Sequence, residues 1–579
     1  MYKRQVGSAD RPSAERLLHA LERKDFVGRV RRGSVGAESE YLFRHLLVRD
    51  VAYGQIPRSA RAKKHLAVAQ WVEELSADRA EDRAELLANH YVSALELSSA
   101  AGEVDDDLCE RARVALENAG DRAFGLAAYV DAARLYDKAL ELTEEHSVER
   151  ARLMLSVGQA QNHAGLPGAR ASLEVASAEL FEHGEVEGAA QAQVALADMS
   201  WEEGRRDESD AHMEHAQALV EDRGLSVTAA WVAARASRFL MVSSDFPAAL
   251  DAGTKALRMA EDLGIDELRA HVLNNVGGSR WGAGDDHGLE QIEEAIEVAE
   301  AANSPFEMSR AHVNLAAGMA STGDLARKYE LELRAEAICA RFGVVRQARW
   351  VQGNLVFSEY ILGDWAAAER RLDAFIAQLD AGEPHYLAAE VYGRRGLISA
   401  ARGRFDEACA DAELSVALAR EAKDNQLALG TYAAAAHIFD LAGRRKDAEP
   451  LVAEFISVLV AEEEIGFSVT DLVTLAWTAV ELGRGDELAS LLVSRERWPW
   501  ARAARAYCEG RPLEAADLCA SMGALPVEAF TRLRAAEELV AAGRGAEAND
   551  QVRQALAFYQ SVGATAFVRR AEMVLPASA

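Results

Sequence analysis

The chain has 579 residues, half of them hydrophobic, and its 93 acidic and 64 basic residues give a formal net charge of −29. So acidic a chain repels phosphate and is a poor nucleic-acid binder. Its five cysteines lie far apart, no apolar run approaches the ~18 residues of a membrane helix, and no apolar signal region opens the chain. We therefore expect a cytoplasmic protein with free thiols and without nucleic-acid or membrane partners.

The first 70 residues differ from the rest, because they carry a net charge of +8. We interpret residues 1–5 (MYKRQ) as a sequencing artefact and the chain as the tail of a longer protein. Residues 13–26 have helical apolar spacing, residues 30–43 alternate around a Gly-rich turn, and residues 45–55 again predict a helix. Helix, hairpin and helix together predict a winged-helix-like piece over residues 6–58.

Within this piece, residues 43–65 read FRHLLVRDVAYGQIPRSARAKKH. This stretch resembles the segment that follows the ATPase in bacterial proteins joining a class III nucleotide cyclase, an AAA-type ATPase of the STAND group and a repeat array. His45 matches the histidine of the Met-His-Asp signature in STAND winged helices, which contacts the β-phosphate of ADP. Arg44 replaces the methionine and Leu46 the aspartate. The resemblance implies that His45 and Arg44 face a nucleotide held by the missing ATPase domain; the alternative is that His45 only packs at a helix start.

Residues 59–107 predict a helical connector that ends in a small, acidic linker, and a repeat array follows over residues 108–579. The array is marked by helix breaks that recur every 39 or 40 residues, with two shorter units at the end. Gly favours such breaks because it adopts a left-handed backbone at low cost. The breaks are at Gly125, Gly165, Gly204, Ser244, Gly284, Gly323, Gly363, Gly403, Gly443, Gly483, Gly510 and Gly543.

This period predicts an all-α solenoid of helix hairpins that resembles tetratricopeptide repeats stretched from 34 to about 40 residues. We expect the aspartates that follow a break to cap the next helix; these are Asp245, Asp285, Asp324 and Asp364. Alanines five residues after the break, such as Ala408, allow the helices to cross closely. We expect each repeat to contact only its neighbours in the array.

The chain has no GxxxxGK[ST] loop and no cyclase or kinase signature, so we expect no enzymatic activity and no cofactor for this chain alone. The resemblance implies a regulatory and protein-interaction arm of a signal-transduction ATPase that controls a nucleotide cyclase. Its partners would be the missing N-terminal ATPase domain and a protein or small-molecule signal on the concave repeat surface. Two alternatives stay open: the sensor arm of a LuxR-type transcriptional activator, and a plain scaffold for complex assembly.

Overall fold

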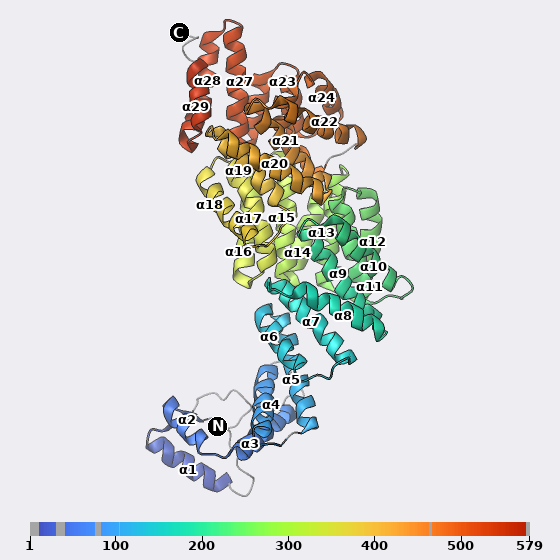
Figure 1. Ribbon diagram of the computed structural model, residues 1–579, viewed down its shortest axis with the longest axis vertical. Coiled ribbons are helices and arrows are strands. Elements are labelled where there is room, and N and C mark those ends of the chain that lie inside the picture. Colours follow the sequence, from blue (N-terminus) through green and yellow to red (C-terminus); the bar gives the residue numbers. More distant parts are fainter. Residues whose placement is uncertain (1–10, 30–40, 76–82, 104, 463–465, 575–579) are drawn as a thin grey trace. The chain divides into compact units, whose positions relative to one another are not determined.

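The computed structural model describes residues 11–29, 41–75, 83–103, 105–462 and 466–574 (Figure 1). The chain divides into an N-terminal unit, Met1–Gly188, and a C-terminal unit, Ala189–Ala579. The described part of the chain is built from helix hairpins, apart from one small β-hairpin near the N-terminus. None of the described helices is long and apolar enough to cross a membrane.

The N-terminal unit begins with the predicted order of helix, hairpin and helix. The two strands pair antiparallel, with Val27 opposite Phe43 and Arg29 opposite Tyr41. The first strand therefore lies before Val30, where the prediction began it, and residues 30–40 lie outside the described part. The elements of this unit are α1 Arg11–Arg23, β1 Val27–Arg29, β2 Tyr41–Phe43, α2 Leu46–Gly54, α3 Arg58–Leu75, α4 Ala84–Ser99, α5 Asp106–Gly125, α6 Tyr129–Leu140, α7 Val148–Ala164 and α8 Ala169–Glu182.

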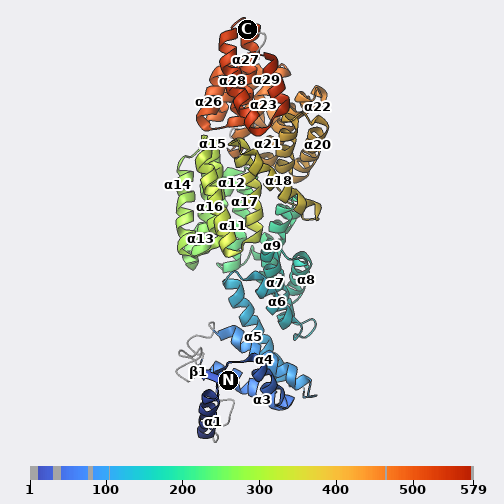
Figure 2. The same cartoon turned by 90° about the vertical axis from the view of Figure 1, so that its left-hand side faces the viewer.

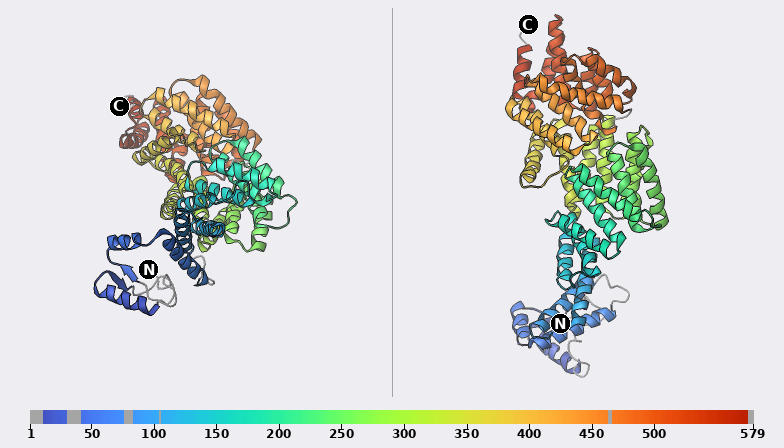
Figure 3. Two further views of the ribbon diagram at one scale, coloured as in Figure 1. Left: turned by 60° about the horizontal axis from the view of Figure 1, so that its bottom comes forward. Right: turned by 45° about the vertical axis from the view of Figure 1, so that its right-hand side comes forward.

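The C-terminal unit consists of stacked hairpins, which Figure 3 shows in two further views. Its elements, of which α9 begins just before the unit, are α9 Val186–Glu202, α10 Arg206–Val220, α11 Val227–Val242, α12 Phe246–Leu263, α13 Asp266–Gly282, α14 His287–Ala301, α15 Pro305–Thr322, α16 Leu325–Phe342, α17 Val345–Ile361, α18 Trp365–Asp380, α19 Ala388–Ala401, α20 Phe405–Ala422, α21 Asn425–Leu441, α22 Arg445–Ala461, η4 Gly466–Asp471, α23 Leu472–Glu481, α24 Gly485–Leu492, η5 Val493–Arg495, α25 Pro499–Cys508, α26 Pro512–Met522, α27 Leu525–Ala541, α28 Gly545–Val562 and α29 Thr565–Val574.

The predicted breaks separate the two helices of each hairpin, and all but one have a left-handed backbone at the predicted residue. At Gly363, for example, φ is +86°; its N–H donates to the Tyr360 carbonyl (3.1 Å), and the N–H of Asp364 donates to the Glu359 carbonyl (2.8 Å). This pair of bonds satisfies carbonyls that a helix end would otherwise leave unpaired. The repeat period is therefore the spacing between successive turns that end the first helix of a hairpin.

One predicted break is wrong. Gly125 is the last residue of α5, and the left-handed residue is Ala127, with φ +58°. The N–H of Ala127 donates to the Phe124 carbonyl and that of Ala128 to the Ala123 carbonyl, both at 2.9 Å. The first helix of this hairpin thus continues to Gly125, which is exposed and has no atom within 4 Å of where a Cβ would lie.

Capping follows the prediction at three of its four aspartates. The carboxylates of Asp245, Asp324 and Asp364 each accept the N–H three residues on, at 3.0–3.2 Å. Asp285 instead accepts the N–H of His287, the first residue of α14, because the preceding turn is one residue longer and Asp286 occupies the cap position.

The C-terminal unit departs from the expectation that a repeat contacts only its neighbours. Helix α15 contacts α25, α17 contacts α27, and α19 contacts α29, so hairpins five apart in the sequence touch. Figure 2 shows the hairpins of this unit from a second side. The indole N–H of Trp500 donates to the Ala320 carbonyl at 2.7 Å, and the Thr565 hydroxyl donates to the Arg402 carbonyl at 2.9 Å. Each hairpin turns the chain by so much that successive turns of the superhelix pack on one another.

Ala408 tests the hairpin register, because it lies fully buried in α20, five residues after the Gly403 break. Ala408→Trp should lower the free energy of unfolding by about 1–3 kcal/mol or more, since the crossing with α19 has no space for an indole. Ala410→Trp, on the exposed side of the same helix, should change it by less than ~0.5 kcal/mol. Urea unfolding followed by circular dichroism measures both. Equal midpoints for the two variants would contradict the register.

Candidate functional site

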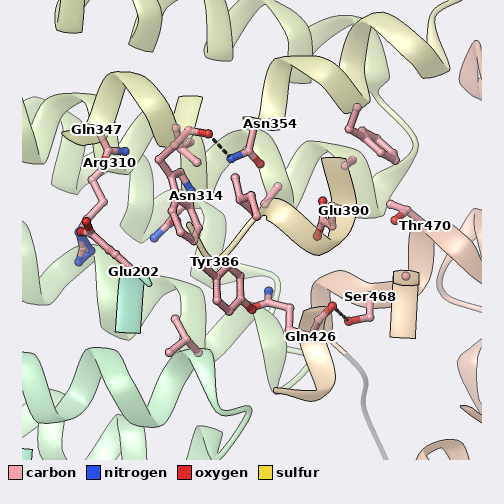
Figure 4. A pocket seen from close by; sticks show the side chains of 18 of the residues that line it. Glu202, Arg310, Asn314, Gln347, Asn354, Tyr386, Glu390, Gln426, Ser468 and Thr470 are labelled. Carbon is pink, nitrogen blue, oxygen red and sulfur yellow. Dashed lines mark hydrogen bonds between the residues drawn. The ribbon is translucent and has the colours of Figure 1, made fainter. Parts of the chain in front are cut away.

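A cavity of about 190 Å³ lies inside the C-terminal unit, and we call it the inner pocket (Figure 4). Its walls come chiefly from the first helices of the hairpins, whose second helices lie on the outside. The pocket is lined by Trp201, Glu202, Arg238, Met241, Val242, Arg310, Val313, Asn314, Ala317, Ala320, Lys328, Arg346, Gln347, Trp350, Asn354, Phe357, Tyr386, Leu387, Glu390, Arg394, Gln426, Gly430, Ser468, Thr470 and Asp471.

Three aromatic rings from distant parts of the chain form one wall. Trp201 of α9 stacks on Trp350 of α17 and on Tyr386, with ring centroids 5.2 and 4.8 Å apart. The Tyr386 hydroxyl donates to Asp424 at 2.8 Å, and its backbone N–H donates to the Glu202 carbonyl at 2.6 Å. These bonds fix the loop before α19 against α9, so the wall joins two successive turns of the superhelix.

Asparagine recurs at one repeat position of the first helices. Asn274, Asn314 and Asn354 are each 40 residues apart, and the next equivalent position is Arg394. The Asn314 amide N–H donates to the Asn274 amide oxygen (3.0 Å), and the Asn354 amide N–H donates to the Trp350 carbonyl (2.9 Å). Among the described residues, the amide oxygens of Asn314 and Asn354 accept no hydrogen bond, so both are available to a ligand.

Five cations line the pocket, and each lies beside a carboxylate. The pairs are Arg238 with Asp198 (2.9 Å), Arg310 with Glu307 (3.3 Å), Lys328 with Glu332, Arg346 with Glu202 (2.5 Å) and Arg394 with Asp471 (3.1 Å). Pairing of this kind is what allows charges to stay in an interior of low dielectric.

Behind Arg310 the polar network continues away from the pocket. Its guanidinium also donates to the Asn275 amide oxygen at 3.0 Å, and Glu307 pairs with the imidazole of His271 at 2.8 Å. Burial, followed by the nearby charges of Arg310 and Arg235, holds the pKa of His271 well below its usual range. His271 is therefore neutral, and it donates to Glu307 without adding a charge.

Two donors in the pocket wall have no hydrogen-bond partner among the described residues. They are the indole N–H of Trp201 and the amide nitrogen of Gln347, in side chains only 4% and 7% exposed. An unpaired buried polar group costs about 1–3 kcal/mol. Both atoms are covered by neighbouring side chains, and a molecule or ordered water that reached them would supply the missing partner.

A second cavity, of about 30 Å³, shares Phe357, Arg394, Thr470 and Asp471 with the inner pocket. Its other walls are largely aromatic, including Trp477 and Phe530. The Nδ1 of His437 and the Tyr559 hydroxyl, both in this wall, have no partner among the described residues. The volume is about the share of one water molecule in the liquid.

His45 and Arg44, the two residues predicted from the STAND resemblance, lie in the N-terminal unit between β2 and α2. His45 occupies the N-cap of α2 with φ −120° and ψ 121°; its exposed side chain makes no capping bond. Arg44 is also exposed, and its guanidinium lies 3.2 Å from the Asp25 carboxylate. Neither belongs to the inner pocket.

Sequence reasoning did not identify the inner pocket. Trp201 and Trp350 stack on each other where their helices meet, and both line the cavity. The asparagine at 40-residue spacing was the one signal in the sequence that could have located the wall. Among the described residues, no group of three His, Cys, Asp or Glu side chains is arranged to hold a metal ion.

No protein-family model matches the chain, and no curated protein does. Solved structures are similar at low scores. A Rap protein complexed with competence and sporulation factor is 12% identical over 71% of this chain and 99% of its own, with a TM-score of 0.38. A STAND protein with a tetratricopeptide repeat sensor from Pyrococcus horikoshii is 15% identical over 77% of this chain and 58% of its own, with a TM-score of 0.35. The Cut9–Hcn1 hetero-tetramer of the APC/C is 14% identical over 82% of this chain and 98% of its own, with a TM-score of 0.32. Scores this low carry no argument about function.

His437 should make stability depend on pH. Burial, with Arg570 and Arg534 nearby, lowers its pKa to about 3. Between pH 6.5 and that value only the unfolded chain binds this proton, so acidification destabilises the fold by about 1.4 kcal/mol per pH unit. His437→Leu should therefore lose less stability than wild type between pH 6.5 and 5, by about 2 kcal/mol. Urea unfolding at both pH values measures the difference; parallel losses would show that His437 is protonated in the fold.

Proposed function

We propose that this chain is a non-catalytic regulatory and protein-interaction arm whose inner pocket binds a short peptide. The observation that carries the proposal is a pocket whose wall holds two unpartnered donors, Trp201 Nε1 and Gln347 Nε2, among the described residues. Peptide carbonyl groups are acceptors and would complete both donors.

The asparagines support a peptide in particular. A peptide group offers one donor and one acceptor, and the available amide oxygens of Asn314 and Asn354 can accept from backbone N–H groups. The two residues occupy equivalent positions one repeat apart, and packed helices lie about 8–10 Å from each other. An extended chain covers that distance in about three residues. A peptide of about five residues would therefore reach both asparagines.

Binding in this pocket would act on the winding of the superhelix. The walls come from α9 and α11 on one side and from α17, α19 and α21 on the other, which belong to successive turns. A ligand that contacts both turns binds best when they are packed together, and it shifts the population towards that state. This differential affinity is what a sensor arm needs.

Filling the pocket tests the proposal. Ala317 is half-buried in its wall, and Ala317→Leu adds three carbons to the cavity. Immobilised protein is incubated with a pool of pentapeptides that have acetylated and amidated ends, and the captured peptides are measured by mass spectrometry. Ala317→Leu should capture about tenfold less than wild type. Ala377→Leu, on the exposed face of α18, should capture as much as wild type. No capture by wild type from this pool or from a pool with free amino termini, or equal capture by wild type and Ala317→Leu, would contradict a peptide site here.

We further propose that the arm belongs to a cytoplasmic STAND ATPase of the kind joined to a nucleotide cyclase, with residues 6–58 as the remnant of its winged helix, residues 59–107 as a connector and residues 108–579 as the array. In support, α2 buries none of its residues, and Leu46, Leu47 and Val51 are 65–80% exposed. Such an apolar helix face is suited to a partner domain. His45 begins this helix, and its imidazole can donate to a β-phosphate held by that domain.

His45→Ala tests this assignment in a longer chain that carries the ATPase module. Loss of a hydrogen bond to a charged phosphate should speed ADP release about tenfold or more. Arg44→Ala should have a smaller effect, because Arg44 already pairs with Asp25. His19→Ala, exposed on α1, is the control. Unchanged release from His45→Ala with normal thermal unfolding would show that the sequence match is coincidental.

A further inference from the structure

Glu390 differs from every other charged residue of the inner pocket. The five cations each have a carboxylate partner within 3.3 Å, and Glu202 and Asp471 are two of those partners. Glu390 makes no hydrogen bond or ion pair among the described residues, although its half-buried side chain lies in the wall. Burial raises the pKa of its carboxyl, which indicates that its charge is poorly compensated. Glu390 is therefore the carboxylate of the pocket wall that has no ion-pair partner among the described residues.

Arg394, the cation nearest to Glu390 in the sequence, already has another carboxylate partner. Arg394, one helical turn from Glu390, donates to Asp471 at 3.1 Å and lies over the Phe357 ring, 4.7 Å from its centroid. Turning its guanidinium to Glu390 would leave Asp471 buried without a partner, which is costly. The chain itself therefore does not supply the charge that Glu390 lacks.

Hydrogen-bonding groups are unevenly distributed over the pocket. Figure 4 shows Gln347 and Arg310 together at one end and Glu390 at the other, with Asn354 between them. The unpartnered donors are Gln347 Nε2 and Trp201 Nε1, whereas Glu390 and the amide oxygens of Asn354 and Asn314 offer only acceptors. An ammonium or guanidinium group carries three to five donors and no acceptor. It therefore matches the acceptors of Glu390, Asn354 and Asn314.

We propose that the ligand of the inner pocket carries a positively charged ammonium or guanidinium group, and that Glu390 pairs with it. The inference rests on the proposed peptide function and specifies its ligand: a peptide with a lysine or arginine side chain, or with a free amino terminus, at the Glu390 end. The unpartnered donors of Trp201 and Gln347 bind its carbonyl groups. A peptide without such a cation would cover the Glu390 carboxylate and lose its hydration without compensation.

Two pentapeptide pools test the inference and distinguish the sources of the charge. In one pool both ends are blocked, so only side chains carry charge; in the other the amino terminus is free. Wild type should enrich lysine and arginine peptides about tenfold in the blocked pool, or enrich peptides in general from the free-terminus pool. Glu390→Gln should abolish that preference while it still captures peptides. Glu421→Gln, exposed on α20, should behave as wild type.

Glu390→Asp keeps the carboxylate and should retain part of the preference for cationic peptides. It serves as the control for misfolding, because a loss in Glu390→Gln alone then follows from the loss of charge. Capture without preference for a cation, or the same preference in Glu390→Gln, would overturn the inference and leave the peptide function standing. Absence of capture by wild type in both pools would overturn the peptide function, and the inference with it.

Discussion

The constraint on which the C-terminal unit depends is the contact between hairpins five apart. A repeat array in which each unit contacts only its neighbours has an open inner surface. Here the Trp500 indole reaches the Ala320 carbonyl five hairpins away, and Arg346 pairs with Glu202 four hairpins and 144 residues away. These bonds require nearly equal rotation at each hairpin, because an error in one repeat would be carried into every later one. The regular helix-ending turns supply that uniformity, and the closed winding turns a concave surface into a pocket.

Around the pocket, one repeat position that elsewhere holds a small alanine holds a charged residue instead. Ala368, Ala408 and Ala448 are fully buried at the fifth position after their breaks, where a small residue allows close helix crossing. The equivalent residue after Gly323 is Lys328, which is 4% exposed and pairs with Glu332 while its ammonium donates to Ser358 at 2.8 Å. A buried lysine at an alanine position costs stability, and local rules are most often broken where function demands it. Lys328 lines the inner pocket.

Much of the fold could be predicted because its determinants are local. A left-handed residue and a capping aspartate are specified within a few residues, so the breaks from Gly165 onward are found at the predicted positions. The shift from Gly125 to Ala127 shows the limit: a glycine near a helix end does not by itself fix which residue takes the left-handed backbone. The pocket could not be predicted, since Trp201, Trp350 and Tyr386 meet only after the superhelix has completed a turn. A sequence pattern predicts where one helix ends and which of its faces is buried. It does not predict the rotation that accumulates over several hairpins and brings distant residues together.

The same winding makes the pocket sensitive to what it holds. Since four or five hairpins separate the contacting helices, small rotations at successive hairpins add up where the turns meet. Such a change would separate Trp201 from Tyr386, which stack within one wall of the pocket, and expose the paired charges beside them. The ion pairs favour the closed state only while water is excluded, because a dielectric close to that of water reduces each pair to about 1 kcal/mol or less. In the proposed function, a ligand that completed the unpartnered donors would stabilise the winding as a whole, so that local binding would alter the geometry of the entire unit.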